Sequence, residues 1–491
     1  MKKTFVLIFL LLLCAQSFSF AEEKRNWNLL ILEGEELEEA ELQGLVFNKS
    51  TASLKLAKKN DEGSFTFPPM DMEPFEYLVL SWNALTPQEA SVELEARFYH
   101  EQEQQWSTWF SWGLWQKSPK RHSYSDEDKY GQLSYDTAWV LGDKATANKV
   151  QVRGVLKGKD VSLRRIALTT LNTMVTEGPV NKEAHPGKVL GELAYSQQIR
   201  HPFMAQLMCS ANTTATQIGL LGEDLLPEEV ALNSYDSHLE GYGNWAFNVA
   251  FAGEAGYKSY LSYADEEELL NLLDQGYPLG MSVAYSNVPG GSLPYLEGAP
   301  LTTGGHLITL RGYEWQDDEL YFIASDSAAE SDEKAKISYK SSQLMQAWKS
   351  RIVYVIEPRE KVEASEIKRL PLTLSLEEDG LARLGGPMPL EIGPTFTAQP
   401  LKEPGRGLLA YTLEGEQGIY YNASLSKDGL VKFPRGTDIE KINLYLMTNL
   451  GLTYVAQVKV GKVADANYYL TLGILIFVLV MYFGFKVRKR S

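Results

Sequence analysis

The sequence predicts a multidomain protein of the α+β class, in which a mixed helical and stranded region lies between two β regions. The first observation is length, because 491 residues are too many for one hydrophobic core. The second is the period-2 alternation of apolar and polar residues in Val92–Phe98 and Lys149–Val155, which is typical of half-buried strands. The third is a helical pattern in the centre of the chain, where Ala215, Ile218 and Leu221 recur on one side.

Polar segments rich in Gly, Pro or charge divide the chain at 172–190 and 358–369. The predicted parts are a signal peptide at 1–21, an N-terminal β-sandwich at 22–175, a central domain at 190–358, a C-terminal β domain at 370–464, a transmembrane helix at 468–485 and a cytoplasmic basic tail at 486–491. We expect the C-terminal β domain to be a small Ig-like sandwich, because turn signals separate its short apolar runs.

The N-terminal β region contains a dense aromatic segment. Four tryptophans fall within ten residues, at Trp106, Trp109, Trp112 and Trp115. Such residues either fill the core of a sandwich or stack on a sugar or peptide ligand, and the core is the more common place for them. The pattern therefore favours a structural role and leaves recognition as the alternative.

The N-terminus is typical of a secretory signal. Lys2 and Lys3 precede an apolar stretch, and small residues surround a cleavage point after Ala21. An alternative is a lipoprotein signal with Cys14 as the lipidated residue, although Leu13 stands where a small residue is expected. Either signal predicts export of the chain.

The C-terminus carries an uncharged apolar run at 468–485. As a helix it would be about 27 Å long, enough to cross a bilayer. Tyr468, Tyr469 and Tyr482 stand near its ends, and four Lys or Arg residues follow it, which marks the cytoplasmic side. We therefore expect a single-pass protein of the bacterial cell membrane, with its bulk outside the cell.

Composition and motifs argue against several kinds of partner and cofactor. The formal net charge is −16, and an acidic exported chain argues against nucleic acid as a partner. The sequence has no HExxH, CxxC or GxxxxGK[ST] motif, so we predict no metal and no other cofactor. The expected partners are the membrane and a peptide or protein substrate outside the cell, and the oligomeric state is left open.

One cysteine, Cys209, remains after removal of the signal. It precedes a run of Ser, Asn and Thr that is typical of a helix entrance, and Gly222 is placed to end that helix in the left-handed conformation. A helix N-terminus favours the thiolate, which is the nucleophilic form. The position of Cys209 alone does not decide between a reactive thiol and a small buried residue of the core.

Two further residues fit the needs of a thiol nucleophile. His306 follows two glycines and begins an alternating stretch typical of a strand. Asp326 ends the next apolar strand, and the polar residues between the strands predict a hairpin turn. Adjacent antiparallel strands would bring His306 beside Asp326, so that the acid fixes the imidazole tautomer. Taken alone, His306 could be an ordinary polar residue of a strand, and Asp326 could be an ordinary turn residue.

The order of cysteine at a helix start, histidine on a strand and acid on the next strand is the papain-type layout. The central region resembles the bacteriocin-processing, or double-glycine, family of papain-like cysteine peptidases, in its stand-alone secreted branch. The resemblance covers roughly residues 190–358. The segments that carry it are Tyr195–Gln197, Cys209–Thr213, Gly243–Ala250, Leu269–Pro278, Gly305–His306, Ser325–Ala328 and Tyr339–Trp348.

By this resemblance, Cys209 is the nucleophile, His306 the general base and acid, and Asp326 the orienting acid. Gln197 is the side-chain donor to the oxyanion, with Gln198 and Gln206 as alternatives. The sequence departs from the family pattern at Ala211 and Ser327, where the family usually has proline.

The implied function is hydrolysis of peptide bonds through a thioester acyl-enzyme. Two other functions are kept as alternatives. One is a catalytically silent surface protein that binds peptides with the same fold. The other is an isopeptidase or acyl transferase that acts on cell-wall peptides, because the thioester serves those reactions equally well.

Overall fold

The computed structural model describes residues 25–87, 89–117, 121–198, 206–223, 225, 227–300, 302–358 and 364, together with seven strands of the C-terminal region. The predicted signal peptide at 1–21, the transmembrane helix at 468–485 and the basic tail at 486–491 lie outside the described residues. Within the part that is described, no helix is long and apolar enough to cross a membrane. These predictions about the two ends of the chain therefore remain predictions.

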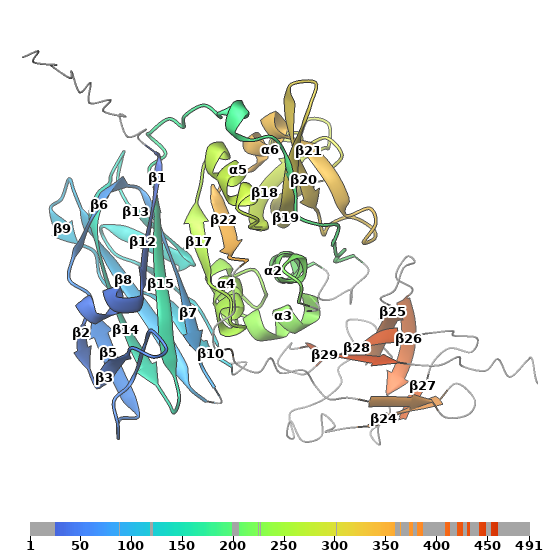
Figure 1. Ribbon diagram of the computed structural model, residues 1–491, viewed down its shortest axis with the longest axis horizontal. Helices are drawn as coiled ribbons and strands as arrows, with labels where there is room; N and C mark the ends of the chain where they lie inside the picture. Colours follow the sequence, from blue (N-terminus) through green and yellow to red (C-terminus); the bar gives the residue numbers. More distant parts are fainter. Residues whose placement is uncertain are drawn as a thin grey trace, which may run out of the picture.

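The N-terminal region is built from two antiparallel sheets (Figure 1). The first has the order β11-β12-β13-β7-β15-β4-β3, with β1 beside β15, and the second has the order β10-β8-β14-β5-β2, with β6 beside β14 and β9 beside β8. The bounds are β1 Trp27–Glu33, β2 Glu41–Gln43, β3 Leu45–Asn48, β4 Ser53–Leu56, β5 Glu62–Thr66, β6 Met70–Phe75, β7 Tyr77–Leu85, β8 Ser91–His100, β9 Gln105–Trp106, β10 Phe110–Gln116, β11 Tyr124–Glu127, β12 Gly131–Tyr135, β13 Thr137–Val140, β14 Ala147–Lys157 and β15 Ser162–Leu171, with the 3-10 helix η1 Gly34–Glu39 after β1. The two stretches of period-2 alternation form β8 and β14, whose buried side chains join one core with those of β7.

The four tryptophans of the aromatic segment divide into two pairs. Trp112 and Trp115 are fully buried. Trp106 and Trp109 are half-buried, and Arg97 lies over both rings at 4.7 Å. Arg153 lies over the Trp109 ring as well, at 4.3 Å. The rings thus fill the core or stack on arginine side chains of their own sheet.

The central region is a third antiparallel sheet, covered by helices (Figure 1). Its strand order is β17-β22-β18-β19-β20-β21, and β16 pairs with β19. The bounds are η2 Lys182–Ala184, β16 Lys188–Val189, α2 Cys209–Leu220, α3 Pro227–Ser234, α4 Trp245–Glu254, β17 Ser259–Tyr263, α5 Glu266–Asp274, β18 Leu279–Ser286, β19 Thr302–Gln316, β20 Glu319–Ser325, β21 Lys336–Lys340, α6 Ser341–Ala347 and β22 Ile352–Ile356. β19 and β20 form the expected hairpin, and Gly222, with φ +97°, follows the end of α2 as predicted.

The segment expected to be a polar linker, 172–190, ends as part of the central sheet. Residues 188–197, which we call the strap, run along β19 and then beside the end of β20. Lys188 pairs with Tyr313, the Leu190 N–H donates to the Arg311 carbonyl, and the Leu193 carbonyl accepts from the Ser325 hydroxyl at 2.8 Å. The strap therefore belongs to the central domain.

The sandwich and the central domain share one core. The indole rings of Trp82 and Trp115 meet the ring of Phe247 on α4 at centroid distances of 6.1 and 5.5 Å. The carboxylate of Glu254, at the end of α4, accepts from the Trp115 indole N–H at 3.0 Å and from the Thr86 hydroxyl at 2.9 Å. Buried contacts of this kind fix one domain against the other.

The C-terminal region contains strands β23 Thr373–Leu376, β24 Leu381–Gly385, β25 Leu408–Thr412, β26 Tyr420–Leu425, β27 Leu430–Lys432, β28 Lys441–Met447 and β29 Thr453–Lys459. They pair antiparallel in the order β23-β24-β27-β26-β25-β28-β29. β structure was expected in this region, and its Ig-like arrangement stays a prediction.

Candidate active site

Cys209 is the first residue of α2 and is partly exposed. Met208 occupies the N-cap position, and no side chain caps the helix. The Ser, Asn and Thr residues that were expected at the helix entrance instead lie inside the helix, where their side chains are buried. The backbone of Ser210 and the backbone of Leu307 on β19 both act on the Cys209 thiol and help to lower its pKa.

His306 lies on β19, opposite Val283 of β18, and only 4% of it is exposed. One side of its imidazole bonds to the Cys209 sulfur. On the other side, Nε2 lies 2.8 Å from Oδ1 of Asp326. Gly304 and Gly305, which precede it, are exposed, and a side chain at either position would meet no neighbouring atom within 4 Å. The strand therefore presents the imidazole between a thiol and a carboxylate, beside open backbone.

Asp326 follows β20 directly and is buried. Its Oδ1 accepts from the backbone N–H of Ala328 at 2.9 Å, in addition to the His306 ring. Its Oδ2 accepts from the phenolic hydroxyl of Tyr339 on β21 at 2.6 Å. Both carboxylate oxygens thus have donors, which holds the group ionised and in one orientation.

The electrostatics of the three residues are coupled. Burial alone would raise the pKa of the Cys209 thiol, but the hydrogen bond and charge of His306 outweigh it and lower that pKa. Burial alone would lower the pKa of His306, but the charge of Asp326 raises it to about 10. Burial would likewise raise the pKa of Asp326, and the imidazolium lowers it. The arrangement favours a thiolate beside an imidazolium at neutral pH.

Of the three candidate glutamines, Gln197 is the one that contacts the turn after β20, beside Asp326. Gln197 is 6% exposed and ends the strap, whereas Gln198 and Gln206 are exposed. The backbone N–H of Gln197 donates to the Ser327 carbonyl at 2.7 Å, and its Oε1 accepts from the Ser327 hydroxyl at 2.7 Å. Gln197 is therefore bonded to the residue that follows Asp326.

Sequence reasoning gave no role to three polar residues around this group. Tyr339 bonds to Asp326, Ser327 bonds to Gln197, and the Ser210 hydroxyl lies 2.7 Å from the Tyr354 hydroxyl behind Cys209. Tyr339 stands at a buried position of β21, so the alternation of that strand was the available signal. No local pattern marks the other two contacts, because each joins segments more than a hundred residues apart.

Two family profiles match this chain. The first, described as the Peptidase C39 N-terminal domain, matches residues 17–176. The second, described as the Peptidase_C39 like family, matches residues 192–353, the region that holds Cys209, His306 and Asp326. The central domain is a Peptidase C39-like domain. The family recognised from the sequence is thereby confirmed, and the domain has a cysteine peptidase fold.

Solved structures similar to the chain include two cathepsin precursors. Procathepsin B S9 from Trypanosoma congolense is 11% identical, with a TM-score of 0.24, over 38% of this chain and 82% of its own. Procathepsin L 3 from Tenebrio molitor larval midgut is 13% identical, with a TM-score of 0.26, over 37% of this chain and 71% of its own. No curated protein matches the chain at a significant level.

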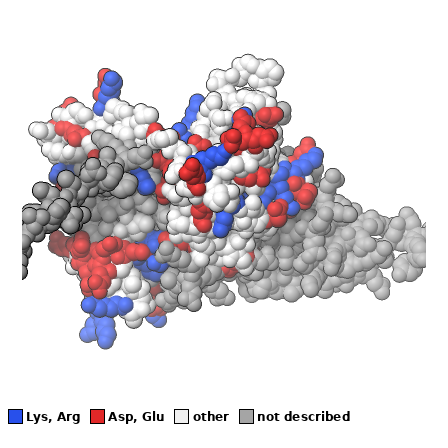
Figure 2. Space-filling model, turned by 45° about the horizontal axis from the view of Figure 1, so that its top comes forward, with Lys and Arg blue, Asp and Glu red and all other residues white. Residues whose placement is uncertain are grey.

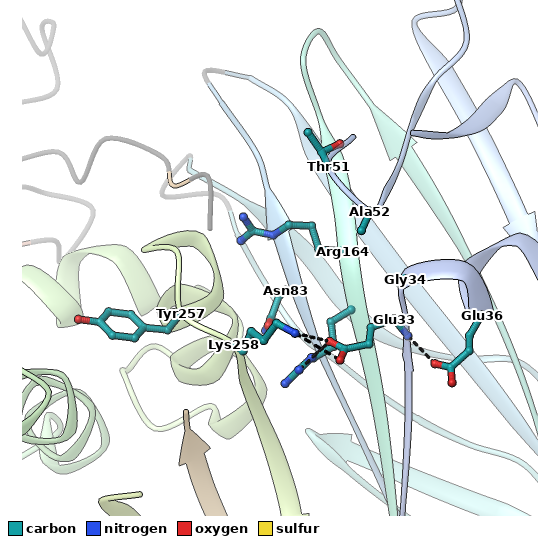
Figure 3. Close-up of a pocket in the computed structure, with 10 residues that line it drawn as sticks. Glu33, Gly34, Glu36, Thr51, Ala52, Asn83, Arg164, Tyr257 and Lys258 are labelled. Carbon is teal, nitrogen blue, oxygen red and sulfur yellow. Dashed lines mark hydrogen bonds and ion pairs between the residues drawn. The ribbon is translucent and has the colours of Figure 1, made fainter. Parts of the chain in front are cut away.

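A pocket of about 400 Å³ lies between the sandwich and the Peptidase C39-like domain (Figure 3). None of Cys209, His306 and Asp326 lines it. Three of its charged lining residues, Glu33, Arg165 and Lys258, form ion pairs. Arg165 lies 2.6 Å from Glu33 and 2.9 Å from Glu357, and Lys258 lies 3.4 Å from Glu33. The pocket is therefore a polar part of the domain interface, distinct from the cysteine site.

Charged side chains of both signs lie close together on the face shown in Figure 2. Lys336 pairs with Glu333, and Lys340 pairs with Glu319, on the edge of the Peptidase C39-like domain. Exposed pairs of this kind contribute little to stability.

Proposed function

We propose that this protein is an extracellular, membrane-anchored cysteine peptidase that hydrolyses peptide bonds through Cys209, His306 and Asp326. The observation that carries the proposal is the continuous set of hydrogen bonds from the Cys209 sulfur through His306 to Asp326, with the pKa of the thiol lowered and that of the imidazole raised. The match of the central domain to a peptidase family supports the same reaction class.

In the acylation step, the Cys209 thiolate attacks the carbonyl carbon of the substrate, and a carbon–sulfur bond forms. The negative charge moves to the carbonyl oxygen, which accepts hydrogen bonds from the Gln197 amide and the Cys209 backbone N–H. The imidazolium of His306 then donates its proton to the amine, which leaves as the carbon–nitrogen bond breaks. Asp326 keeps the imidazole oriented throughout this step.

In the deacylation step, His306 is neutral and accepts a proton from water. The resulting hydroxide attacks the thioester, a second oxyanion forms at the same place, and the carbon–sulfur bond breaks. The product acid leaves and the thiolate–imidazolium pair is restored. Neither step requires a metal, because the thiolate supplies the nucleophile and His306 carries the proton.

The location is proposed from the two ends of the chain. A signal peptide at 1–21 exports the protein, and a helix at 468–485 holds it in the cell membrane with residues 486–491 in the cytoplasm. The substrate is then a peptide or protein outside the cell. The sandwich and the C-terminal β region flank the catalytic domain in the sequence. In this proposal they determine its distance from the membrane and the substrates that it can contact.

The pH dependence of thiol alkylation tests the proposed chemistry. The full chain in mild detergent is treated with iodoacetamide across the pH range, beside the His306→Ala variant. An activated pair gives rapid alkylation well below the ordinary pKa of cysteine, about 8.5, and slow alkylation in the variant. Slow alkylation in both proteins would contradict the proposal and favour the peptide-binding alternative.

Peptide hydrolysis is then measured directly. Heat-denatured protein mixtures are incubated with the full chain or with its Cys209→Ala variant, and new peptide termini are identified by mass spectrometry. Termini that depend on Cys209 support a peptidase. Adding glycine amide distinguishes the acyl-transferase alternative, because a transferase joins that amine to the acyl group in place of water.

A further inference from the structure

One turn carries residues that serve both halves of the site. Asp326 and Ser327 are adjacent in the turn after β20, and both are buried. Asp326 contacts His306, on the side of the nucleophile. Ser327 contacts Gln197, the residue assigned to the oxyanion, through its backbone carbonyl and its hydroxyl, each at 2.7 Å. The position of Gln197 therefore depends on a neighbour of the orienting acid.

The hydroxyl of Ser327 fixes the orientation of the Gln197 side-chain amide, which the backbone contact does not do. A glutamine side chain has an acceptor at Oε1 and two donors at Nε2, and a half-turn of the amide exchanges them. An oxyanion only accepts hydrogen bonds, so it needs Nε2 directed toward it. In that orientation Oε1 points away and needs a donor of its own, because a buried carbonyl without a partner is costly. The Ser327 hydroxyl is that donor.

A hydrogen bond at one end of an amide also strengthens the other end. Donation to Oε1 draws electrons toward the oxygen and makes the N–H groups better donors, and such chains reinforce one another inside a protein. The proline that the family pattern usually has at this position has no hydroxyl to donate. The change to serine in this chain thus adds a contact that acts on the oxyanion donor.

We propose that Ser327 is a positioning residue that holds the Gln197 amide with Nε2 toward the oxyanion, so that it accelerates acyl transfer at Cys209 without changing the reactivity of the thiolate. This inference rests on the proposed function. The proposed role predicts that Ser327 affects some reactions of Cys209 and leaves others unchanged. Ser327 matters to reactions in which a carbonyl oxygen becomes negative, and it is indifferent to reactions of Cys209 that form no oxyanion.

Two reagents separate these reactions in the full chain in mild detergent. With p-nitrophenyl acetate, the Cys209 sulfur bonds to the acetyl carbon, an oxyanion forms, and p-nitrophenolate leaves before water releases acetate. With iodoacetamide, the sulfur displaces iodide from a saturated carbon and no oxyanion forms. The first rate is read from the colour of p-nitrophenolate and the second from the mass of the alkylated protein.

The Ser327→Ala variant is expected to slow acylation about tenfold, which equals about 1.4 kcal/mol of transition-state stabilisation. Its alkylation rate should stay within about twofold of the unsubstituted chain. Ser327→Thr keeps the hydroxyl and should keep both rates. Ser325→Ala is the matched control, because it removes a hydroxyl of the same strand end that bonds to the strap at the Leu193 carbonyl instead of to Gln197.

A double variant tests whether Ser327 acts through Gln197. Acylation in Gln197→Ala with Ser327→Ala should be no slower than in Gln197→Ala alone, because the second change removes nothing further. Unchanged acylation in Ser327→Ala, equal slowing with both reagents, or additive losses in the double variant would each overturn the positioning role. If Cys209 of the unsubstituted chain reacts with both reagents no faster than free cysteine, the proposed function itself fails, which is a different result.

Discussion

The exchange Asp326→Asn removes one charge from the site and nearly preserves its shape. Burial alone lowers the pKa of His306, and the charge and hydrogen bond of Asp326, together with Cys209, raise it from 6.5 to about 10. At 1.36 kcal/mol per pKa unit, this difference corresponds to about 5 kcal/mol in favour of the imidazolium. Asp326 makes the largest contribution to raising the pKa of His306, so most of this stabilisation should be lost in the variant.

The expected result follows from the sign of each effect. Without the carboxylate, burial lowers the pKa of His306 below its ordinary value, and the imidazole is neutral at pH 7. The Cys209 thiolate then loses its cation, and its pKa rises. The iodoacetamide rate should fall at least tenfold near pH 6 and recover to within about threefold near pH 10, where cysteines ionise without help.

A second measurement follows His306 itself. In a Cys209→Ala background, the imidazole carbon shifts are recorded by NMR against pH. The imidazole should titrate above 6.5 with Asp326 present and below 6.5 in the D326N protein, because burial is then unopposed. The reasoning is wrong if the D326N protein keeps both the low-pH part of the alkylation profile and the pKa of His306 unchanged. Asp326 would then not stabilise the imidazolium.

Three other predictions concern the remaining parts of the site and the chain. Gln197→Ala should slow acylation by p-nitrophenyl acetate about 100-fold, whereas the exposed Gln198→Ala should leave it unchanged, and the reverse result would move the oxyanion role. Tyr339→Phe should lower the free energy of unfolding in urea by about 1.5–3 kcal/mol, since Oδ2 of Asp326 loses a buried donor, and equal stability would contradict this. Deletion of 468–491 should move the protein from the membrane fraction to the soluble fraction of a cell lysate, and retention in the membrane would reject the predicted anchor.

The proximity of Cys209, His306 and Asp326 could be predicted because its signals are local. His306 and Asp326 stand on consecutive strands joined by a short polar turn, and a hairpin of that kind leaves few choices of partner. Cys209 precedes a run of small and polar residues that begins a helix. What local pattern did not show is how the helix begins, because the buried polar side chains of α2 face other elements instead of capping its first turn.

The choice among the three candidate glutamines and the contacts between the domains could not be predicted from local pattern. The choice of Gln197 over Gln198 depends on Ser327, which lies 130 residues further along the chain. The core between the domains depends on contacts such as Trp115 with Glu254, which are 139 residues apart. A sequence pattern indicates the type of one helix or strand and where it begins and ends. It does not indicate which distant side chains contact that element.

The shared core also ties the chemistry to the order in which the chain is made. The sandwich is synthesised first, and its face around Trp82, Trp115 and Thr86 contacts α4 in the folded protein. His306 and Asp326 emerge later still, and Tyr339 last of the group. A nascent chain thus carries Cys209 as an ordinary thiol until almost the whole of residues 25–356 has assembled. Under the proposed function, the thiol is activated only by the completion of the fold that contains it, because its partners His306 and Asp326 are synthesised after it.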